Sequence, residues 1–554
     1  MNNVHQKRFK KTKFYKNYTI PIVLFLDQIG LLSFFIPLVN KLIKFVGIKK
    51  RFNSKLNYRI YADSFEGAFS SQEEKPSKTA LFFFTMGSES SFLLRQLIIA
   101  KYLESLNWKV EFLVCSGNII ACNKERIGKS KENSPFMCRE CSWGYSWVKK
   151  QTGIQMNTLN ITKLKPSDLK KIENIKTLEE CENYTTEDNA PLGRIAKKNV
   201  LRYFYQGSLI NTENELSVFK KYLAGSLQTV RGLNHYFSDK KPDLIIMMNG
   251  VGNLDQSMIY QAEKLNIDYI TQEVFYGSNS WVFKKNGIAI HLNYMKEWMK
   301  YGVKLNIKQK EELYNFLDKI KKGKVFQTKM HDSEIGPIPL EKGVTLFTNM
   351  NFDTYVLGRN SLFKSMENWL IETIEFWKEN VKDIPLYIRA HPGEVKTPTP
   401  AIRFVRDIVK PHLNENIILI DSDSEINSYS LIKKSKYVIT YASTVGAESM
   451  MQGVPCVCAG EAFYKSFAIV PKNTSEYFDK LLKMNSNSKQ DIDIDNLESF
   501  LHYLYMKRIF QFEGFDINRG DSKIDLSNLS KYENLIEQNK SILDSFYQMC
   551  VING

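Results

Sequence analysis

Two strand-to-loop junctions decide the fold: LYIRAHPGE at residues 386–394 and YVITYASTVGAE at residues 437–448. Each begins with an apolar run typical of a buried strand and then turns into glycine, proline and polar residues. A third apolar run, CVCA at 456–459, follows a helix-like segment that Gly453 and Pro455 end. Strands that alternate with helical segments predict an α/β fold with a parallel sheet, and such sheets bind ligands at the carboxyl ends of their strands.

The residues at these two strand ends are suited to binding phosphate. Pro392 keeps the preceding residue extended, so His391 is held at the end of its strand, where an imidazole can donate a hydrogen bond near neutral pH. Ser443 and Thr444 lie where the next strand turns into a helix, and their hydroxyls and the first helical N–H groups can converge on an anion. Arg389 adds a positive charge. The purely structural alternatives are a turn at the histidine and a helix cap at the two hydroxyls.

These motifs resemble those of known transferases. His391-Pro392 followed by Ser443-Thr444 is similar to the HP and S/T motifs of GT-B glycosyltransferases that use CMP-activated sugars, such as bacterial sialyltransferases and capsule-synthesis Kdo transferases. The chain resembles the capsular and surface polysaccharide biosynthesis family more closely, over roughly residues 240–465. The strings that carry this resemblance are LFTN, MENWL, IRAHPGE and STVGAE, at residues 346–349, 366–370, 388–394 and 443–448.

The resemblance implies both a fold and a donor site. The expected fold is GT-B, in which two Rossmann-like domains face a cleft. By this likeness His391, Ser443 and Thr444 bind the donor's nucleotide phosphate. Our own expectation from the residues adds Arg389 to this site, has His391 protonate or stabilise the leaving group, and places fixed N–H groups and cations where other enzymes use a metal ion. Glu448 is expected at the donor ribose, with a helix-surface role as the alternative. Teichoic-acid polyol-phosphate transferases have a similar Arg-x-His-Pro plus Ser-Ser arrangement, so the donor class stays open.

The chain of 554 residues is too long for a single core, and its 43% hydrophobic content is typical of globular proteins. We predict an N-terminal basic and apolar extension at 1–75 and a Rossmann-like acceptor domain at 76–325. A second Rossmann-like domain, at 343–480, is predicted to hold the nucleotide-sugar. The helical segment at 481–554 is expected to cross back onto the N-terminal half.

The formal charge of +16 predicts an anionic partner. A nucleic-acid partner is not expected, because no zinc-finger, helix-turn-helix or RRM motif accompanies the charge. The partners expected are a nucleotide-sugar, a lipid-linked glycan acceptor and an anionic membrane surface. Residues 7–16 are basic and residues 19–39 largely apolar, but Asp27 near the middle argues against a spanning helix. We therefore predict peripheral attachment to the cytoplasmic face of the membrane, with a buried N-terminal helix as the alternative.

Eight cysteines at irregular spacing, with no signal peptide, indicate a reducing compartment. Four of them lie close together in the sequence and leave a tetrahedral zinc site open as an alternative to unligated thiols: Cys115, Cys122, Cys138 and Cys141. Cys115 lies in the apolar run FLVC, which is typical of a buried strand. Unligated thiols are the favoured interpretation, and no cofactor is required for the predicted reaction.

Strand ends in the N-terminal half supply the candidate acceptor and base residues. Gly87 and Glu89 follow the apolar run LFFF at 81–84, and Asn249 follows LIIMM at 244–248. These three residues are predicted to contact the acceptor. A carboxylate is the expected general base on the acceptor hydroxyl. Glu273 is ranked first, Asp255 second and Glu89 third.

A long helical pattern extends from Ile195 to Tyr236. Four cations at its beginning would lie on adjoining turns: Arg194, Lys197, Lys198 and Arg202. They are suited to meeting an acceptor phosphate, and a solvated helix face is the equally weighted alternative.

The function predicted from these features is sugar transfer from a nucleotide donor, CMP-activated by the resemblance, to a growing bacterial surface or capsular polysaccharide. Two alternatives stay open. One is a CDP-polyol phosphotransferase of the teichoic-acid type. The other is a non-catalytic GT-B scaffold that binds a lipid-linked glycan.

Overall fold

The computed structural model describes residues 63–69, 76, 78–86, 90–127, 137–161, 163–275, 280–302, 304–322, 341–359, 362–396, 403–486, 491–514, 516–517, 524–525 and 531–552. The predicted membrane-associating extension lies almost wholly outside these residues. Among the described helices none is long and apolar enough to cross a membrane.

The first sheet has seven strands, in the order β12-β6-β5-β4-β1-β2-β3. Its first five strands in the sequence are parallel. At one edge β6 pairs antiparallel with β5, and β12 pairs antiparallel with β6. The strands are β1 (Lys78–Phe84), β2 (Trp108–Cys115), β3 (Met156–Leu159), β4 (Leu244–Met247), β5 (Asp268–Val274), β6 (Ser280–Lys285) and β12 (Phe510–Gln511). The central strands β1 and β4 are buried nearly throughout, as their continuous apolar runs predict.

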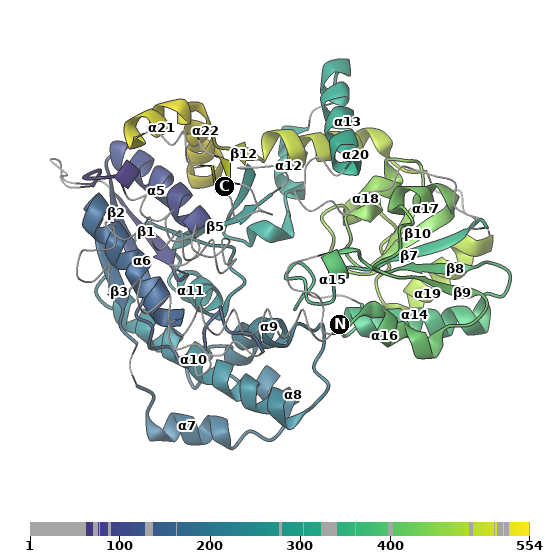
Figure 1. Cartoon of the computed structure of the whole chain (residues 1–554), viewed down its shortest axis with the longest axis horizontal. Coiled ribbons are helices and arrows are strands. Elements are labelled where there is room, and N and C mark those ends of the chain that lie inside the picture. Colours follow the sequence, from purple (N-terminus) through teal and green to yellow (C-terminus); the bar gives the residue numbers. More distant parts are fainter. Residues whose placement is uncertain are drawn as a thin grey trace, which may run out of the picture.

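The second sheet has five parallel strands, in the order β11-β10-β7-β8-β9. They are β7 (Gly343–Phe347), β8 (Leu386–Arg389), β9 (Ile417–Ile420), β10 (Ser435–Thr440) and β11 (Cys456–Cys458). When each set of parallel strands is numbered from its own start, both sheets have the Rossmann order 3-2-1-4-5. The prediction of an α/β protein with two Rossmann-like halves is confirmed. Figure 1 shows the two sheets side by side.

Helices connect the strands and cover the sheets (Figure 1). In the N-terminal half the main helices are α5 (Ser90–Ser105), α6 (Met137–Thr152), α7 (Pro166–Glu173), α8 (Leu178–Glu182), α9 (Leu192–Phe204), α10 (Glu213–Phe237) and α11 (Asn253–Lys264). In the C-terminal half they are α14 (Met366–Asn380), α15 (Gly393–Lys396), α16 (Val405–Val409), α17 (Ser428–Lys434), α18 (Val445–Met450) and α19 (Thr474–Ser486). Between the halves lie η2 (Ala289–His291), α12 (Met295–Tyr301) and α13 (Ile307–Lys321).

The predicted long helix from Ile195 to Tyr236 is wrong, because the chain breaks into α9 and α10. Tyr205 ends α9 in the left-handed region, at φ 53°, and so turns the chain out of the helix. Thr212 begins α10 with a capping box, in which its side chain accepts from the N–H of Glu215. The loop between the two helices contacts the C-terminal half, and no periodicity signal in the sequence marks it.

The predicted apolar stripe on α14 is buried in the core of the C-terminal half. Met366, Trp369, Leu370, Ile374 and Trp377 are each at most 3% exposed. The indole of Trp369 satisfies its N–H by donating to the Tyr477 hydroxyl at 2.9 Å. The stripe is therefore a packing surface, as its helical spacing predicts.

The C-terminal segment returns to the N-terminal half, as expected. After α20 (Ile494–His502), strand β12 pairs with β6 of the first sheet. Helices α21 (Tyr532–Gln538) and α22 (Lys540–Phe546) then pack on that half, where Tyr102 donates to Asp544 at 2.5 Å. Figure 1 shows these helices, in yellow, beside α5. The last segment of the chain thus joins the two halves.

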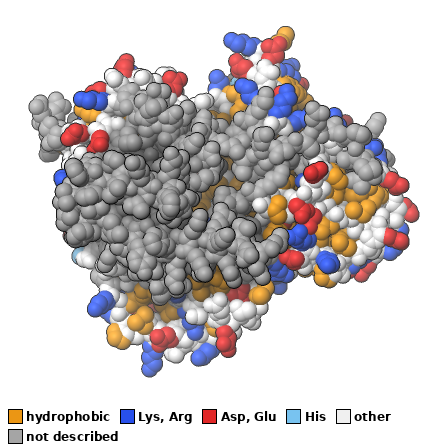
Figure 2. All heavy atoms as spheres, viewed as in Figure 1, with side chains coloured by type: hydrophobic (Ala, Val, Ile, Leu, Met, Phe, Trp, Pro, Cys, Tyr) orange, Lys and Arg blue, Asp and Glu red, His pale blue; other side chains and the backbone are white. Residues whose placement is uncertain are grey.

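Basic and acidic side chains are interspersed on the described surface that Figure 2 shows. The protruding helix α13 (top of the figure) carries both signs, and its Lys310 pairs with Asp495 and Glu498 at 3.0 and 2.6 Å. The described basic side chains on this face therefore form no single positive patch.

Candidate active site

The predicted donor residues lie at and beyond the carboxyl ends of β8 and β10, the two strands that flank β7. From β7 the chain adds β8 and β9 on one side, and then β10 and β11 on the other. The strand order therefore reverses beside β7, and α/β sheets bind ligands at such a topological switch point. Side chains after β7 hold the other two loops in place. Thr348 Oγ1 accepts the N–H of His391 at 3.1 Å, and Asn349 Oδ1 accepts the N–H of Ala442 at 3.2 Å.

The imidazole of His391 has a defined orientation. Its Nδ1 accepts the backbone N–H of Gly393 at 2.9 Å. In the neutral ring the proton is therefore on Nε2, which becomes the donor. Gly393 has no room for a larger side chain, because an added Cβ would lie 2.8 Å from this Nδ1. The HPG sequence thus fixes both the ring and its tautomer.

Arg389 is the last residue of β8 and is 3% exposed. Its guanidinium donates to the carbonyl of Asp421 and, at 3.3 Å, to that of Ser424. Burial lowers its pKa to about 10, while Asp421 and Asp423 oppose this shift. Both terminal nitrogens of the guanidinium donate to carbonyls of the loop after β9 and hold that loop in place. These contacts favour a positioning role for Arg389 over direct phosphate binding.

The turn after β10 presents Ser443 and Thr444 in different ways. Among the residues that the structure describes, none forms a hydrogen bond with the Ser443 hydroxyl, whereas the Ser443 carbonyl accepts from Tyr464 at 2.5 Å. Thr444 is the N-cap of α18, but its hydroxyl donates to Glu448 at 3.3 Å and does not cap the helix. Burial raises the pKa of Glu448. Of the two hydroxyls, that of Ser443 is the better placed for a ligand.

In the N-terminal half the structure brings Glu273 and Asn249 together. Glu273 lies near the end of β5 and is 8% exposed. Its Oε2 accepts from Asn249 Nδ2 at 3.1 Å, and its Oε1 accepts the N–H of Val274 at 2.8 Å. Each carboxylate oxygen therefore has one donor and retains further acceptor capacity.

Asp255 lies on the first turn of α11, buried beside the end of β1. Its Oδ1 accepts from the Thr85 hydroxyl at 3.4 Å. Burial raises its pKa to about 7, although Thr85, Arg202 and the N–H of Gly252 favour the ionised form. Arg202 of α9 interacts electrostatically with both Asp255 and Glu273, and burial lowers its own pKa to about 10. This edge of the first sheet thus brings together two carboxyl groups and one half-buried cation.

The remaining candidates are the acceptor residues Gly87 and Glu89 and the four cysteines of the possible zinc site. Gly87 and Glu89 lie outside the described residues. No group of three or more His, Cys, Asp or Glu side chains in the described parts of the chain is arranged to hold a metal ion. Cys138 donates to the Gly117 carbonyl at 3.2 Å, and none of the four candidate cysteines forms a disulfide.

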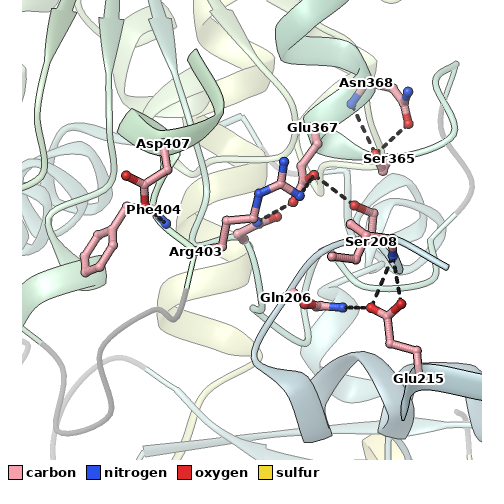
Figure 3. A network of polar contacts seen from close by, with 11 residues as sticks. Gln206, Ser208, Glu215, Ser365, Glu367, Asn368, Arg403, Phe404 and Asp407 are labelled. Atoms are coloured by element: carbon pink, nitrogen blue, oxygen red, sulfur yellow. Dashed lines mark hydrogen bonds and ion pairs between the residues drawn. The ribbon is translucent and has the colours of Figure 1, made fainter. Parts of the chain in front are cut away.

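A polar network joins the two halves next to these edges (Figure 3). Glu367, on the first turn of α14, accepts from Ser208 of the α9–α10 loop at 2.9 Å and from Arg403 at 2.8 Å. Its other oxygen accepts from Asn351 at 2.8 Å. Gly207 packs directly on Asn351, because an added Cβ would lie 2.0 Å from Asn351 Oδ1. No local pattern marks Ser208 or Glu367 as contact residues, since polar residues give no signal in the sequence of a contact between distant segments.

Comparison with known proteins agrees with the predicted resemblance. Residues 254–489 match the model of the family described as capsule polysaccharide biosynthesis protein. This segment contains Glu273, Asp255 and all the residues of the donor edge. The match confirms the resemblance over this part of the chain. No curated protein sequence matches the chain.

Several solved structures are similar at low identity. The beta Kdo 2,4 transferase of Thermosulfurimonas dismutans KpsC is 14% identical, with a TM-score of 0.34, over 53% of this chain and 87% of that one. The beta Kdo 2,7 transferase of the same KpsC is 13% identical, with a TM-score of 0.31, over 56% and 89%. The UDP-GlcNAc 2-epimerase of Methanocaldococcus jannaschii is 12% identical, with a TM-score of 0.24, over 77% and 99%. Similarity at this level does not define the donor or the reaction of this protein.

Proposed function

We propose that this protein is a glycosyltransferase that transfers a sugar from a CMP-activated donor to a growing capsular polysaccharide. The match to a capsule biosynthesis family and the two Rossmann-like sheets support this class of activity. The observation that carries the proposal is the held imidazole of His391, with Nδ1 satisfied by Gly393, at the switch point of the second sheet.

The proposed donor site uses His391 and the turn after β10. The Nε2–H of His391 and the Ser443 hydroxyl donate to the nucleotide phosphate and stabilise the charge that develops when it departs. Thr444 and Glu448 form the wall of the same turn, with Glu448 near the ribose. Arg389 supports the site by holding the loop after β9. This arrangement needs no metal ion.

In the proposed reaction Glu273 is the general base. Its carboxylate takes the proton of the acceptor hydroxyl, and the hydroxyl oxygen forms a bond to the anomeric carbon of the donor sugar. The bond from that carbon to the phosphate oxygen breaks, and the nucleotide leaves with the electron pair. Asn249 keeps the carboxylate oriented, and Asp255 is the second candidate for the base. The acceptor is a lipid-linked glycan at the cytoplasmic face of the membrane. The basic residues 7–16 would bring the protein to this face by their attraction to anionic lipids.

Nucleotide binding tests the proposal. The thermal unfolding midpoint is measured with CMP, UDP, GDP and ADP on wild type, His391→Ala and the control His412→Ala, whose ring pairs with Glu375 away from this edge. A nucleotide at 100 times its Kd stabilises the folded state by about 2.7 kcal/mol. We expect CMP to stabilise wild type and His412→Ala but not His391→Ala. Stabilisation by UDP or GDP instead would contradict the CMP donor, and no stabilisation by any nucleotide would favour a scaffold.

A second comparison separates the sugar donor from a polyol donor. Wild type is incubated with a lipid-linked acceptor and either a CMP-sugar or CDP-glycerol, and the product is analysed by mass spectrometry. A glycosidic product formed with release of CMP is expected. A phosphodiester product formed from CDP-glycerol would establish the polyol-phosphate alternative.

A further inference from the structure

Three cations and one histidine from three separate segments meet where the two halves touch. We call this group the interface cation cluster: Arg194 and Lys198 of α9, His291 of η2, and Arg359 of the loop between β7 and α14. Arg194 and Lys198 are one helical turn apart, so they share a face of α9. Arg202, which interacts with Asp255 and Glu273, lies one further turn along the same face.

Lys198 reaches from the N-terminal half onto the backbone of the C-terminal half. A Cβ added to Gly358 would lie 2.9 Å from Lys198 Cε and 3.1 Å from its Cγ. Gly358 has a φ of +64°, a conformation that glycine adopts without strain. The lysine stem therefore packs against the residue that precedes Arg359, which brings the two charges close together.

Arg359 is held in place by its own loop and by the donor edge. Its guanidinium lies 4.7 Å from the ring centroid of Tyr355, and its Nη1 donates to the Tyr355 carbonyl at 3.4 Å. The hydroxyl of Tyr355 in turn accepts the N–H of Phe463 at 3.2 Å. Phe463 precedes Tyr464, the residue that holds the Ser443 carbonyl. The cluster thus adjoins both proposed substrate sides.

The cluster has no acidic partner in the part of the chain that the structure describes. Neither Lys198, Arg194 nor Arg359 forms an ion pair with a described carboxylate, whereas the adjacent Lys197 pairs with Glu182 at 2.7 Å. Burial, with Arg359 and Arg194 nearby, lowers the pKa of Lys198 to about 8. Burial, with Arg359 and Lys198 nearby, lowers the pKa of His291 to about 3, so its ring stays neutral. His291 Nε2 is buried without a hydrogen-bond partner among the described residues.

Like charges that are held close together without a counter-charge repel each other, and a bound anion would remove this cost. Guanidinium and ammonium groups are the usual donors to phosphate and carboxylate. We propose that Arg194, Lys198 and Arg359 form an oxyanion-binding subsite at the junction of the two halves, which takes a phosphate or carboxylate group of the glycan acceptor. The acceptor side is assigned because two of the cations lie on α9, whose Arg202 interacts with Asp255 and Glu273. This assignment to an acceptor rests on the proposed function, whereas the anion site itself does not.

Anion binding to the full chain tests the subsite. Inorganic pyrophosphate and glucuronate are titrated calorimetrically at low ionic strength into wild type, Lys198→Met and Arg359→Gln. Methionine retains the unbranched stem that packs on Gly358 and removes only the charge. We expect at least one of the two anions to bind wild type and to bind each variant about tenfold more weakly. Binding of pyrophosphate alone identifies a phosphate subsite, and binding of glucuronate alone identifies a sugar-acid subsite.

Two control variants locate the bound anion. Lys197→Met removes the neighbouring lysine that already has an acidic partner, and His391→Ala removes the proposed donor-phosphate contact. Lys197→Met is expected to bind the anion as wild type does. His391→Ala is expected to lose at most the pyrophosphate bound at the proposed donor site and to keep the Lys198-dependent binding. The subsite is wrong if neither anion binds wild type, if Lys198→Met binds as wild type does, or if His391→Ala abolishes binding. Far-ultraviolet circular dichroism of each variant checks that it is folded.

The same preparation separates this inference from the proposed function. Should CMP stabilise wild type while neither anion binds, only the subsite fails. Should pyrophosphate bind in a Lys198-dependent manner while no nucleotide binds, the subsite stands and the transferase proposal fails.

Discussion

Asn249 donates a 3.1 Å hydrogen bond to Glu273, and this contact joins the ends of two neighbouring parallel strands, β4 and β5. The second oxygen of Glu273 accepts the N–H of Val274 at 2.8 Å. Two donors on one carboxylate fix its plane. A base held in this way is oriented before the acceptor arrives, which reduces the cost of reaching the reactive geometry.

Replacement of Glu273 by glutamine is expected to lower kcat for sugar transfer by about 10²–10⁴-fold, since the amide cannot accept the proton of the acceptor hydroxyl. The stabilisation by CMP is expected to remain, because the nucleotide binds the other half. Initial rates with saturating donor measure the effect. The matched control is Glu263→Gln on α11, where the carboxylate accepts a hydrogen bond from the Tyr269 hydroxyl. This variant is expected to retain the wild-type rate. An unimpaired Glu273→Gln enzyme would exclude this residue as the base.

The buried Asp255 makes stability depend on pH. Its pKa is about 7 in the folded protein against 3.8 in the unfolded chain, so between these values only the unfolded chain releases the proton. The free energy of unfolding therefore falls as pH rises from about 4 to about 7, because the unfolded chain ionises this carboxyl more easily than the folded protein does. Above pH 7 this loss of stability remains. The groups that face Asp255 are the Thr85 hydroxyl, Arg202 and the N–H of Gly252.

Asp255→Asn cannot ionise and is expected to be more stable than wild type above pH 7, by up to about 4 kcal/mol. Its advantage is expected to shrink toward pH 4. Urea unfolding at a series of pH values measures the difference. Asp479→Asn, at an exposed position on α19, serves as the control and shows no such trend. A pH-independent difference for Asp255→Asn would show that Asp255 is ionised throughout.

Truncation of Glu367 is expected to weaken the contact between the halves. Glu367→Ala leaves the Asn351 amide, the Ser208 hydroxyl and Arg403 without their acceptor, which costs about 2–3 kcal/mol. Ser208→Ala removes one donor from the same carboxylate and costs about 1 kcal/mol. Free energies of unfolding from urea titration test this order. Glu372→Ala, exposed on the same helix, is expected within about 0.5 kcal/mol of wild type. A Glu367→Ala protein as stable as Glu372→Ala would show that the network contributes nothing.

Gly207→Ala tests the closeness of the same interface. The new methyl group would lie 2.0 Å from Asn351 Oδ1 and 2.8 Å from the Asn351 carbonyl oxygen, so the loop must move. A loss of about 1–3 kcal/mol in the free energy of unfolding is expected. The comparison is Gly453→Ala, where nothing lies within 4 Å and only the left-handed backbone, at φ +76°, opposes the change. That variant is expected to lose about 1 kcal/mol. Gly207→Ala with wild-type stability would mean that the halves are not in contact here.

Much of the fold is predictable because it depends on local patterns. Buried strands such as 81–84, 244–248 and 386–388 are continuous apolar runs, and parallel strands with both faces covered require such runs. His391 and Ser443 follow strand ends directly, so their common edge follows from the rule for ligand sites in α/β sheets. Asn249 and Glu273 meet for the same reason.

One prediction was wrong because its outcome depends on contacts between distant segments. The 195–236 segment has a continuous helical pattern, but a left-handed residue at Tyr205 divides it. Other details could not be read from the sequence for the same reason. Carbonyls after β9 accept from the Arg389 guanidinium. The spacing of Cys115, Cys122, Cys138 and Cys141 does not determine where their side chains lie.

The sequence by itself determined the α/β class, the two Rossmann-like halves and the motif residues at the strand ends, because strand burial and turn chemistry are encoded within a few neighbouring residues. Only the tertiary structure decided which cations are satisfied and which are not. Lys197 and Lys198 are adjacent in the chain, yet one pairs with Glu182 and the other packs against Gly358 of the opposite half. The physical reason is that the environment of a charge is set by the groups that surround it in space, and those come from segments far apart in the sequence.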